Sequence, residues 1–149
     1  MTLTGEEREL LLAEVETALQ EVRSPAVRER YEALREATAA GEVPPGLIPG
    51  VQALMGIGLQ SGWIRRRHRA DGEQVAQGLY ERTPAGKSAR EQADALTAAL
   101  AGLRGQRLEQ ARVAPSGPGT WVLVLETDQG TVRVRFSDSG VGISGVEIG

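Results

Sequence analysis

The sequence predicts an α+β protein, because the spacing of its apolar residues changes once along the chain. Up to about residue 105, apolar residues recur every three or four positions, which is the period of an amphipathic helix. From residue 108 onward they alternate with polar residues, in four short runs separated by glycine-containing turns. We therefore predict a helical domain over residues 1–105 and a four-stranded antiparallel β-unit, a meander, over residues 106–149.

Capping signals mark where three of the expected helices begin. Thr4 is followed three residues later by Glu7, the spacing of a capping box. Ser24 and Thr83 each stand directly before a proline, which fits the first position of a helix. The first helix carries an apolar stripe, and its carboxylates, Glu14 among them, are expected on the solvated surface.

A further helix and a hairpin are expected between these segments. Residues 47–59 are strongly apolar and hold three glycines, which we attribute to close packing against a neighbouring element. The Ser-Gly pair at residues 61–62 is typical of a helix end. Residues 63–69 and 74–82 flank an Asp-Gly pair at residues 71–72, a strong signal for a β-hairpin.

The four strands are expected at residues 107–114, 120–127, 131–137 and 141–148. In the third, Val132, Val134 and Phe136 alternate with arginines, so this strand has one dry face and one wet face. Residues 121–125 are apolar on both faces. This predicts either a central strand or one that meets a partner.

Composition excludes several classes of protein. The chain has 149 residues, a net charge of −3 and no cysteine, so disulfides, thiolate metal sites and a cysteine nucleophile are excluded. The first residues are acidic and polar, unlike a signal peptide, and no run of 18 apolar residues is present. We expect a cytoplasmic protein that does not cross a membrane.

The most basic segment is residues 65–69, Arg-Arg-Arg-His-Arg, and residues 43–112 carry ten basic and six acidic residues. Arginines on a hairpin are suited to gripping phosphates; a solvated hairpin, or one paired with the acidic first helix, is the alternative. His68 is the only histidine, which makes it a poor metal ligand. Because no catalytic or phosphate-loop motif is present, we predict no catalytic residue, metal or cofactor, and no enzyme.

Residues 24–103 resemble the winged-helix domain of PadR-like and MarR-like bacterial regulators. The apolar third helix runs into Gly-Trp-Ile at residues 62–64, and a basic segment with a glycine turn follows, as in a wing. Residues 80–87, Tyr-Glu-Arg-Thr-Pro-Ala-Gly-Lys, resemble the Tyr-x-x-Thr-x-x-Gly-Arg signature that closes the wing. The resemblance implies a transcription regulator that binds DNA.

Two functions follow, and the sequence leaves both open. The first is nucleic-acid binding or transcription regulation through the wing. Its candidate DNA-binding residues are Arg65, Arg66, Arg67, Arg69, Gln52 and Gln60. The alternative is a protein–protein interaction module that has lost DNA binding and docks a partner on the sheet; a third helix buried in the structure favours it. We also expect a homodimer. The candidate interface residues are Leu11, Val15 and Leu19 in the first helix and Trp121, Val122 and Val124 in the sheet.

Overall fold

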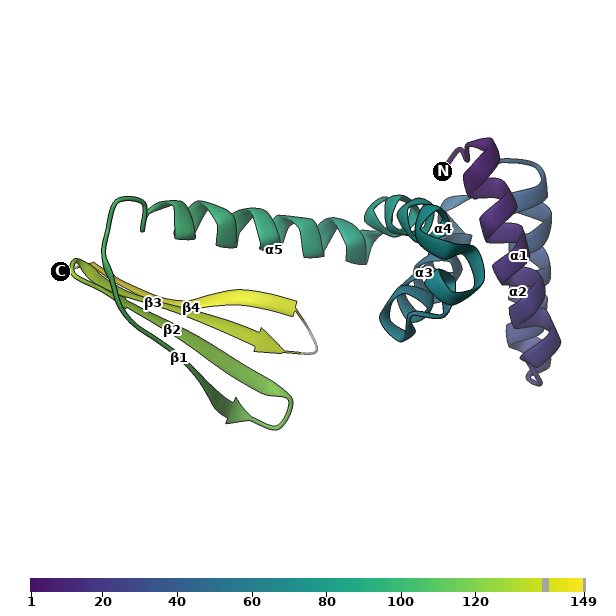
Figure 1. Cartoon of the computed structure of the whole chain (residues 1–149). Helices are drawn as coiled ribbons and strands as arrows, with labels where there is room; N and C mark the ends of the chain where they lie inside the picture. The colour runs from purple at the N-terminus through teal and green to yellow at the C-terminus, as the bar shows by residue number, and fades with distance from the viewer. Residues whose placement is uncertain (138–139, 149) are drawn as a thin grey trace. The chain divides into compact units, whose positions relative to one another are not determined.

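The computed structural model describes residues 1–137 and 140–148, which form helices followed by an antiparallel sheet (Figure 1). The predicted α+β class is confirmed. The bounds of the helices are α1 Gly5–Glu21, α2 Pro25–Ala39, the 3-10 helix η1 Pro45–Leu47, α3 Ile48–Ser61, α4 Trp63–Glu81 and α5 Pro84–Ala101. The bounds of the strands are β1 Leu108–Gly117, β2 Thr120–Thr127, β3 Gly130–Ser137 and β4 Gly140–Ile148.

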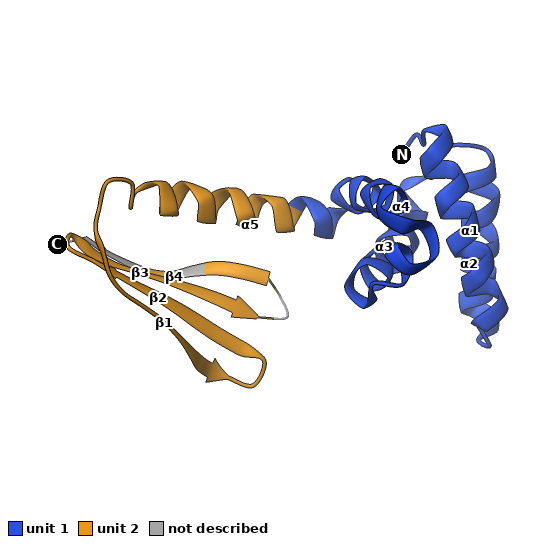
Figure 2. Cartoon of the chain, in the orientation of Figure 1, with its two compact units in different colours: residues 1–87 blue, residues 88–149 orange. Residues whose placement is uncertain are grey.

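The chain divides into two compact units, residues 1–87 and residues 88–149 (Figure 2). The boundary falls inside α5, whereas the change of apolar period had suggested residues 105–106. Gln92 of α5 gives the reason, because its Oε1 accepts a hydrogen bond of 3.1 Å from the backbone N–H of Val141 in β4. Most of α5 therefore belongs with the sheet.

The helical unit is built around one apolar core that its four α-helices share. α1 lies beside α2, and α3 lies beside α4 (Figure 1). The buried residues of this core are Leu10, Leu11, Val15, Leu19, Leu34, Val43, Val51, Leu54, Met55, Ile64, Ala76 and Leu79. Fully burying one large apolar side chain contributes about 1.5–3 kcal/mol, so this shared core is the main source of stability for residues 1–87.

Two of the three predicted capping side chains act as expected. Thr4 Oγ1 accepts a hydrogen bond from the N–H of Glu7, and the Glu7 carboxylate accepts one from the N–H of Thr4, at 3.3 and 2.8 Å. Thr83 Oγ1 accepts from the N–H of Gly86 at the start of α5, at 3.3 Å. Ser24 precedes α2 as predicted, but its side chain makes no capping hydrogen bond.

The predicted hairpin over residues 63–69 and 74–82 is wrong, because these residues lie in α4 or directly after it. α4 consists of two helical stretches that meet at Arg69, whose φ of 61° and ψ of −163° are not helical, and the Asp-Gly pair at residues 71–72 lies in the second stretch, just after this break. Residues 73–79 consist mostly of good helix formers, and the helix buries Ala76 and Leu79 in the core. The local turn signal was outweighed by this buried helical face, so the segment does not form a β-wing.

Close approach between α3 and α4 explains one of the glycines in the third helix. A Cβ on Gly58 would lie 2.8 Å from Trp63 Nε1 and closer still to the side chain of Ile64. Gly62 then ends α3 in the left-handed region, with φ +70°, and Trp63 begins α4 at once. The expectation of close packing at these glycines is thus confirmed at Gly58.

The sheet is the predicted meander, with the strand order β1-β2-β3-β4 and each pair antiparallel. Val132 and Val134 are 2% and 1% exposed, which confirms the dry face of β3, and Phe136 on the same face is half-buried. Arg135 points to the other face and is exposed. The alternation of apolar and polar residues therefore predicted both the strands and which side chains of β3 are buried.

Candidate functional site

The arginine segment, which we define as residues 65–69, occupies the first turns of α4. It follows α3 through the single left-handed residue Gly62. Two helices joined by a short glycine turn are the arrangement in which many DNA-binding proteins present their second helix. The segment is therefore displayed by a helix, where the sequence suggested a strand.

All four arginines of the segment are exposed to solvent, and within the described residues Arg65, Arg66 and Arg69 make no contact with Glu14. The side chain of Arg65 is 69% exposed and pairs loosely with Glu73, with 3.6 Å between Nη1 and Oε2. Arg66 donates from Nη1 to the carbonyl oxygen of Ser61 at 3.2 Å, and Arg69 is exposed at the break in α4. These three side chains lie within five residues of one another and concentrate positive charge at the surface around the beginning of α4.

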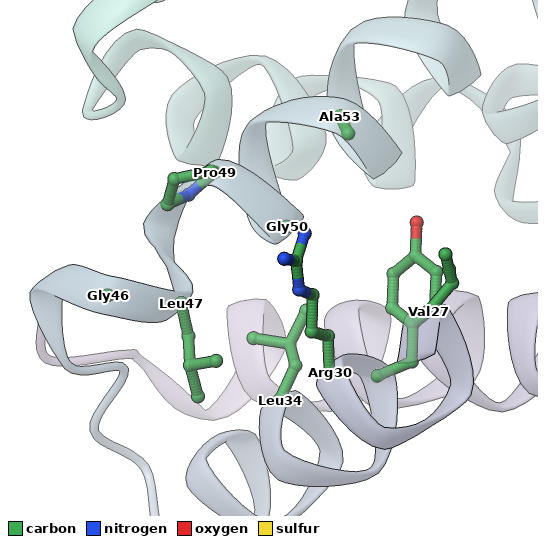
Figure 3. Close-up of a pocket in the computed structure, with 9 residues that line it drawn as sticks. Val27, Arg30, Leu34, Gly46, Leu47, Pro49, Gly50 and Ala53 are labelled. Atoms are coloured by element: carbon green, nitrogen blue, oxygen red, sulfur yellow. The ribbon is translucent and has the colours of Figure 1, made fainter. Parts of the chain in front are cut away.

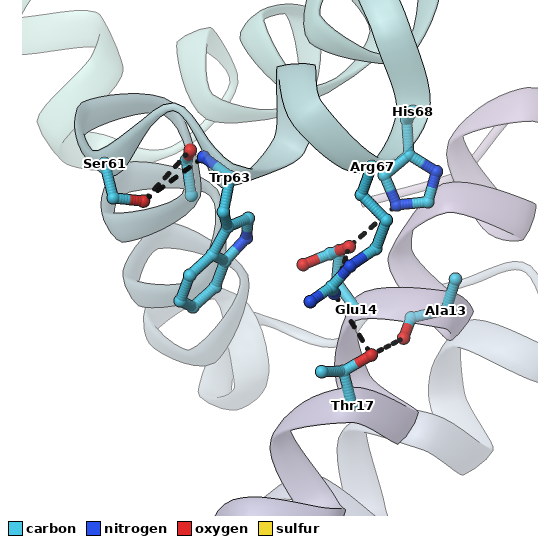
Figure 4. Close-up of polar contacts among 8 residues, drawn as sticks. Ala13, Glu14, Thr17, Ser61, Trp63, Arg67 and His68 are labelled. Carbon is cyan, nitrogen blue, oxygen red and sulfur yellow. Dashed lines mark hydrogen bonds and ion pairs between the residues drawn. The ribbon is translucent and has the colours of Figure 1, made fainter.

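Arg67 and His68 instead turn toward α1 and meet the carboxylate of Glu14 (Figure 4). Arg67 Nη1 lies 3.0 Å from Glu14 Oε1 and 3.1 Å from Thr17 Oγ1. His68 Nε2 lies 2.7 Å from the same Glu14 oxygen. Glu14 is 1% exposed, so its predicted place on the solvated surface is wrong.

The burial of Glu14 makes these contacts necessary, because a buried charge without partners is strongly disfavoured. Within the described residues, Glu14 Oε2 has no hydrogen-bond partner, so Oε1 holds both contacts with α4. The Arg67 guanidinium also lies over the ring of Trp63, 5.9 Å from its centroid. This cluster fixes the first turns of α4 against α1 and thereby orients the exposed arginines.

The sequence held a signal for the burial of Glu14 that charge alone obscured. Glu14 stands three residues after Leu11 and one before Val15, within the arc of the apolar stripe. A residue at that position of an amphipathic helix faces the core. The polar character of glutamate suggested solvent, and only the approach of Arg67 and His68 from α4 makes its burial tolerable.

The two glutamines among the predicted nucleic-acid-binding residues lie in different environments. Gln52 Oε1 accepts a hydrogen bond of 3.0 Å from the N–H of Ala85, so this side chain holds the beginning of α5. Gln60 is exposed in the last turn of α3. The exposed members of the set are therefore Arg65, Arg66, Arg67, Arg69 and Gln60, of which Arg67 is held by Glu14, while Gln52 is used inside the helical unit.

The predicted interface residues also separate into two groups. Leu11, Val15 and Leu19 lie in the core of the helical unit, so its surface does not present them to a partner. In the sheet, Val124 is 5% exposed and Val122 is half-buried, whereas Trp121 is 52% exposed. Trp121 is thus the residue of the set that one chain leaves open.

A groove between α2 and α3 was not anticipated from the sequence. It has a volume of about 490 Å³ and is mostly apolar; Figure 3 shows Arg30 reaching from α2 toward α3. Its lining residues are Val27, Arg30, Tyr31, Leu34, Gly46, Leu47, Pro49, Gly50 and Ala53. Burial raises the pKa of the Tyr31 hydroxyl. The groove depends on how two helices pack, which local sequence patterns do not encode.

Among the described residues, no group of three or more histidines, aspartates or glutamates is placed to hold a metal ion. No helix in the described ranges is both long and apolar enough to span a bilayer. Comparison with protein-family models, curated proteins and solved structures gave no match.

Proposed function

We propose that the helical unit binds the phosphate backbone of nucleic acid through Arg65, Arg66 and Arg69. The observation that carries this proposal is the exposure of these three arginines within five residues at the beginning of α4. They stand on a rigid base, because Arg67 and His68 anchor the same turns to Glu14. Phosphate oxygens are the usual partners of such arginines.

The position of the arginines in α4 supports the same function. In helix-turn-helix proteins, the N-terminal residues of the second helix approach the DNA. The positive end of the helix dipole also lies there and favours a phosphate. Arginines placed at that end repel the dipole in the free protein, so a bound anion relieves an unfavourable arrangement of charge.

Base-specific recognition is not a part of this proposal. α3 carries no lysine or arginine, and Gln60 is its exposed side chain with amide hydrogen-bonding capacity. One amide gives little discrimination between base pairs. We therefore propose binding that is mainly electrostatic and tolerant of sequence.

The test is a titration of duplex DNA at several salt concentrations. The wild-type chain is compared with a triple variant, Arg65→Ala, Arg66→Ala and Arg69→Ala. The logarithm of the binding constant should fall by about 0.9 per decade of salt for each phosphate contact. The triple variant should bind more weakly and lose most of that salt dependence.

A matched control removes the same charge from another surface of the helical unit. Its changes are Arg8→Ala, Arg23→Ala and Arg35→Ala, three exposed arginines of α1, α2 and the link between them. This control should keep nearly wild-type affinity. Equal losses in the two triple variants would show that net charge alone matters, and would reject the arginine segment as the site.

A role in protein–protein interaction is the second candidate. It is favoured by the burial of Val51, Leu54 and Met55, because an apolar α3 used in the core is unsuited to reading DNA. It is also favoured by the exposure of Trp121 on the sheet. Failure of the wild-type chain to bind duplex DNA even at low salt would leave this second function as the better proposal.

A further inference from the structure

The outer edge of the sheet at β1 is open in a single chain. β1 pairs with β2 on one side, and no other described strand pairs with it. Leu108 and Val113 on this strand are 55% and 65% exposed. An edge with unpaired backbone groups and exposed apolar side chains is a template for another strand.

The register places these two apolar residues on one face of the sheet. Val113 lies opposite Leu123, and Ala111 lies opposite Leu125. A register shift between Leu108 and Gln110 returns Leu108 to the same face, because it adds one residue to β1. Leu108, Ala111 and Val113 therefore form an apolar row beside the exposed edge.

We infer that β1 pairs with β1 of a second copy of this chain, antiparallel and centred on Ala111. In this arrangement Ala111 faces Ala111 of the second copy across a two-fold axis. Val113 then faces Leu108 of the second copy on either side of the axis, since the register shift sets both on the same face. The two most exposed apolar side chains of the strand cover each other.

Charge on the strand fits the same pairing. In this pairing Arg112 would lie opposite Gln110 of the second copy. Glu109 of the second copy, at the register shift between Leu108 and Gln110, would lie beside Arg112. Both charged side chains are more than half exposed, at 56% and 52%; within one chain Arg112 lies 3.6 Å from Glu126 and Glu109 lies 3.2 Å from Arg107, so the pairing would add a further opposite charge beside each surface pair. No like charges face each other directly, which would otherwise destabilise the pair.

The edge is also accessible within the unit that carries it. The hydrogen bond between α5 and the sheet is made at Val141 in β4, on the opposite edge of the sheet from β1. Pro115 lies near the end of β1, and proline in a sheet is confined to edges, strand starts and bulges. Pairing through β1 would join two four-stranded sheets into one continuous sheet and enlarge their apolar face.

A single cysteine tests the position of the axis, since the chain has none of its own. Directly opposed Cα atoms in antiparallel strands are about 4.5–5.5 Å apart, which lies within the range that a disulfide spans. The full-length Ala111→Cys variant should therefore form a covalent dimer under mild oxidation. The measurement is a non-reducing gel over a time course.

Val113→Cys is the matched control, because Val113 is highly exposed but lies two residues from the axis. Its Cα would be about 14 Å from its counterpart, since about four residues at a rise of about 3.4 Å each separate the two along the strands. This variant should remain largely monomeric. Cross-linking of Val113→Cys as fast as Ala111→Cys, or of neither variant, would overturn the proposed pairing.

Sedimentation equilibrium gives an independent readout without any cross-link. Val113→Lys should weaken the dimer at least tenfold, whereas Ile57→Lys, at a residue 54% exposed on α3, should leave it unchanged. A wild-type chain that sediments as a 15.9 kDa monomer at all accessible concentrations would overturn the inference. Because these residues are separate from the arginine segment, DNA binding and dimerisation can fail independently.

Discussion

A single carboxylate, Glu14, decides how the arginine segment is presented. Its Oε1 atom contacts both Arg67 and His68, so two of the five residues in the segment are committed to holding α4 on α1. The remaining arginines face solvent. Adjacent residues of one basic run thus have opposite tasks, and their positions around the helix determine which task each one has.

Removing the charge of Glu14 should destabilise the helical unit. Glu14→Gln keeps the size of the side chain but leaves Arg67 without its counter-charge and His68 without a carboxylate partner. We expect a loss of about 2 kcal/mol, less than for a fully buried pair, because the Arg67 side chain is 42% exposed and water can reach it. Urea denaturation of the full chain measures the change in the free energy of unfolding.

Glu16→Gln supplies the control for this prediction. Glu16 lies on the same helix and is exposed, so its substitution should change the free energy of unfolding by less than about 0.5 kcal/mol. If the two variants lose the same stability, the contacts of Glu14 contribute nothing beyond the general charge of α1.

Arg69 holds a backbone conformation that costs energy. Its φ of 61° and ψ of −163° lie in a region that is almost restricted to glycine. Such strain costs about 1–3 kcal/mol, and glycine lowers stability by about 0.5–1 kcal/mol through its entropy in the unfolded chain. Arg69→Gly should therefore stabilise the protein by about 1 kcal/mol.

Arg69→Ala is the comparison that separates strain from charge. Alanine removes the same charge but keeps the steric penalty of a Cβ at positive φ. Thermal unfolding should show a higher midpoint for the glycine variant than for the alanine variant. Equal midpoints would mean that the backbone relaxes at no cost when the side chain is shortened.

At the level of elements, strand β3 tests whether alternation of apolar and polar residues correctly separates buried from exposed side chains. Val134→Ala should destabilise the sheet unit by about 2 kcal/mol, because Val134 is 1% exposed and a cavity would remain. Arg135→Ala, one residue away on the other face, should cost less than about 0.5 kcal/mol. Hydrogen exchange of the β3 amides reports on this unit alone.

Comparable losses at residues 134 and 135 would contradict the observed register, because a slip of one residue exchanges the two faces. Phe136→Ala is a weaker test of the same face. The ring is only half-buried, so its loss should be smaller than the cost of about 3–5 kcal/mol for a fully buried phenylalanine.

The elements that were predictable share one property, which is that a local rule agreed with the tertiary environment. The capping box at Thr4, the stop at Gly62 and the four alternating strands are of this kind. α4 was missed because a local rule and the environment disagreed. Its Asp-Gly pair favours a turn, but burial of Ala76 and Leu79 requires a helix.

The sequence predicted which arginines belong to the candidate site, but it did not predict which of them are exposed and which are paired. Its arginines were evident from the sequence, but their division into exposed and paired residues depends on Glu14, which lies more than 50 residues away. Gln52 likewise contacts a residue distant in sequence, because Ala85 at the start of α5 lies 33 residues away. Contacts of that range follow from packing, which no local period encodes.

For the whole molecule, the distribution of charge matters more than its sum. The net charge is −3, so nucleic acid and protein repel each other weakly at long range. In the proposed function, attraction would be restricted to the arginine segment and would become strong only within about 10 Å, the screening length at ordinary ionic strength. A protein of this kind should bind nucleic acid with little of the long-range steering that strongly basic proteins have.

The continuity of α5 across the two units has a thermodynamic consequence. Gln52 and Thr83 order its first turn from the helical unit, and the sheet holds the same helix at Gln92. Helix formation is cooperative, so ordering one end lowers the cost of ordering the next turns. Ordering of the helical unit should therefore also favour the helical state of α5 as far as Gln92, the residue that bonds β4.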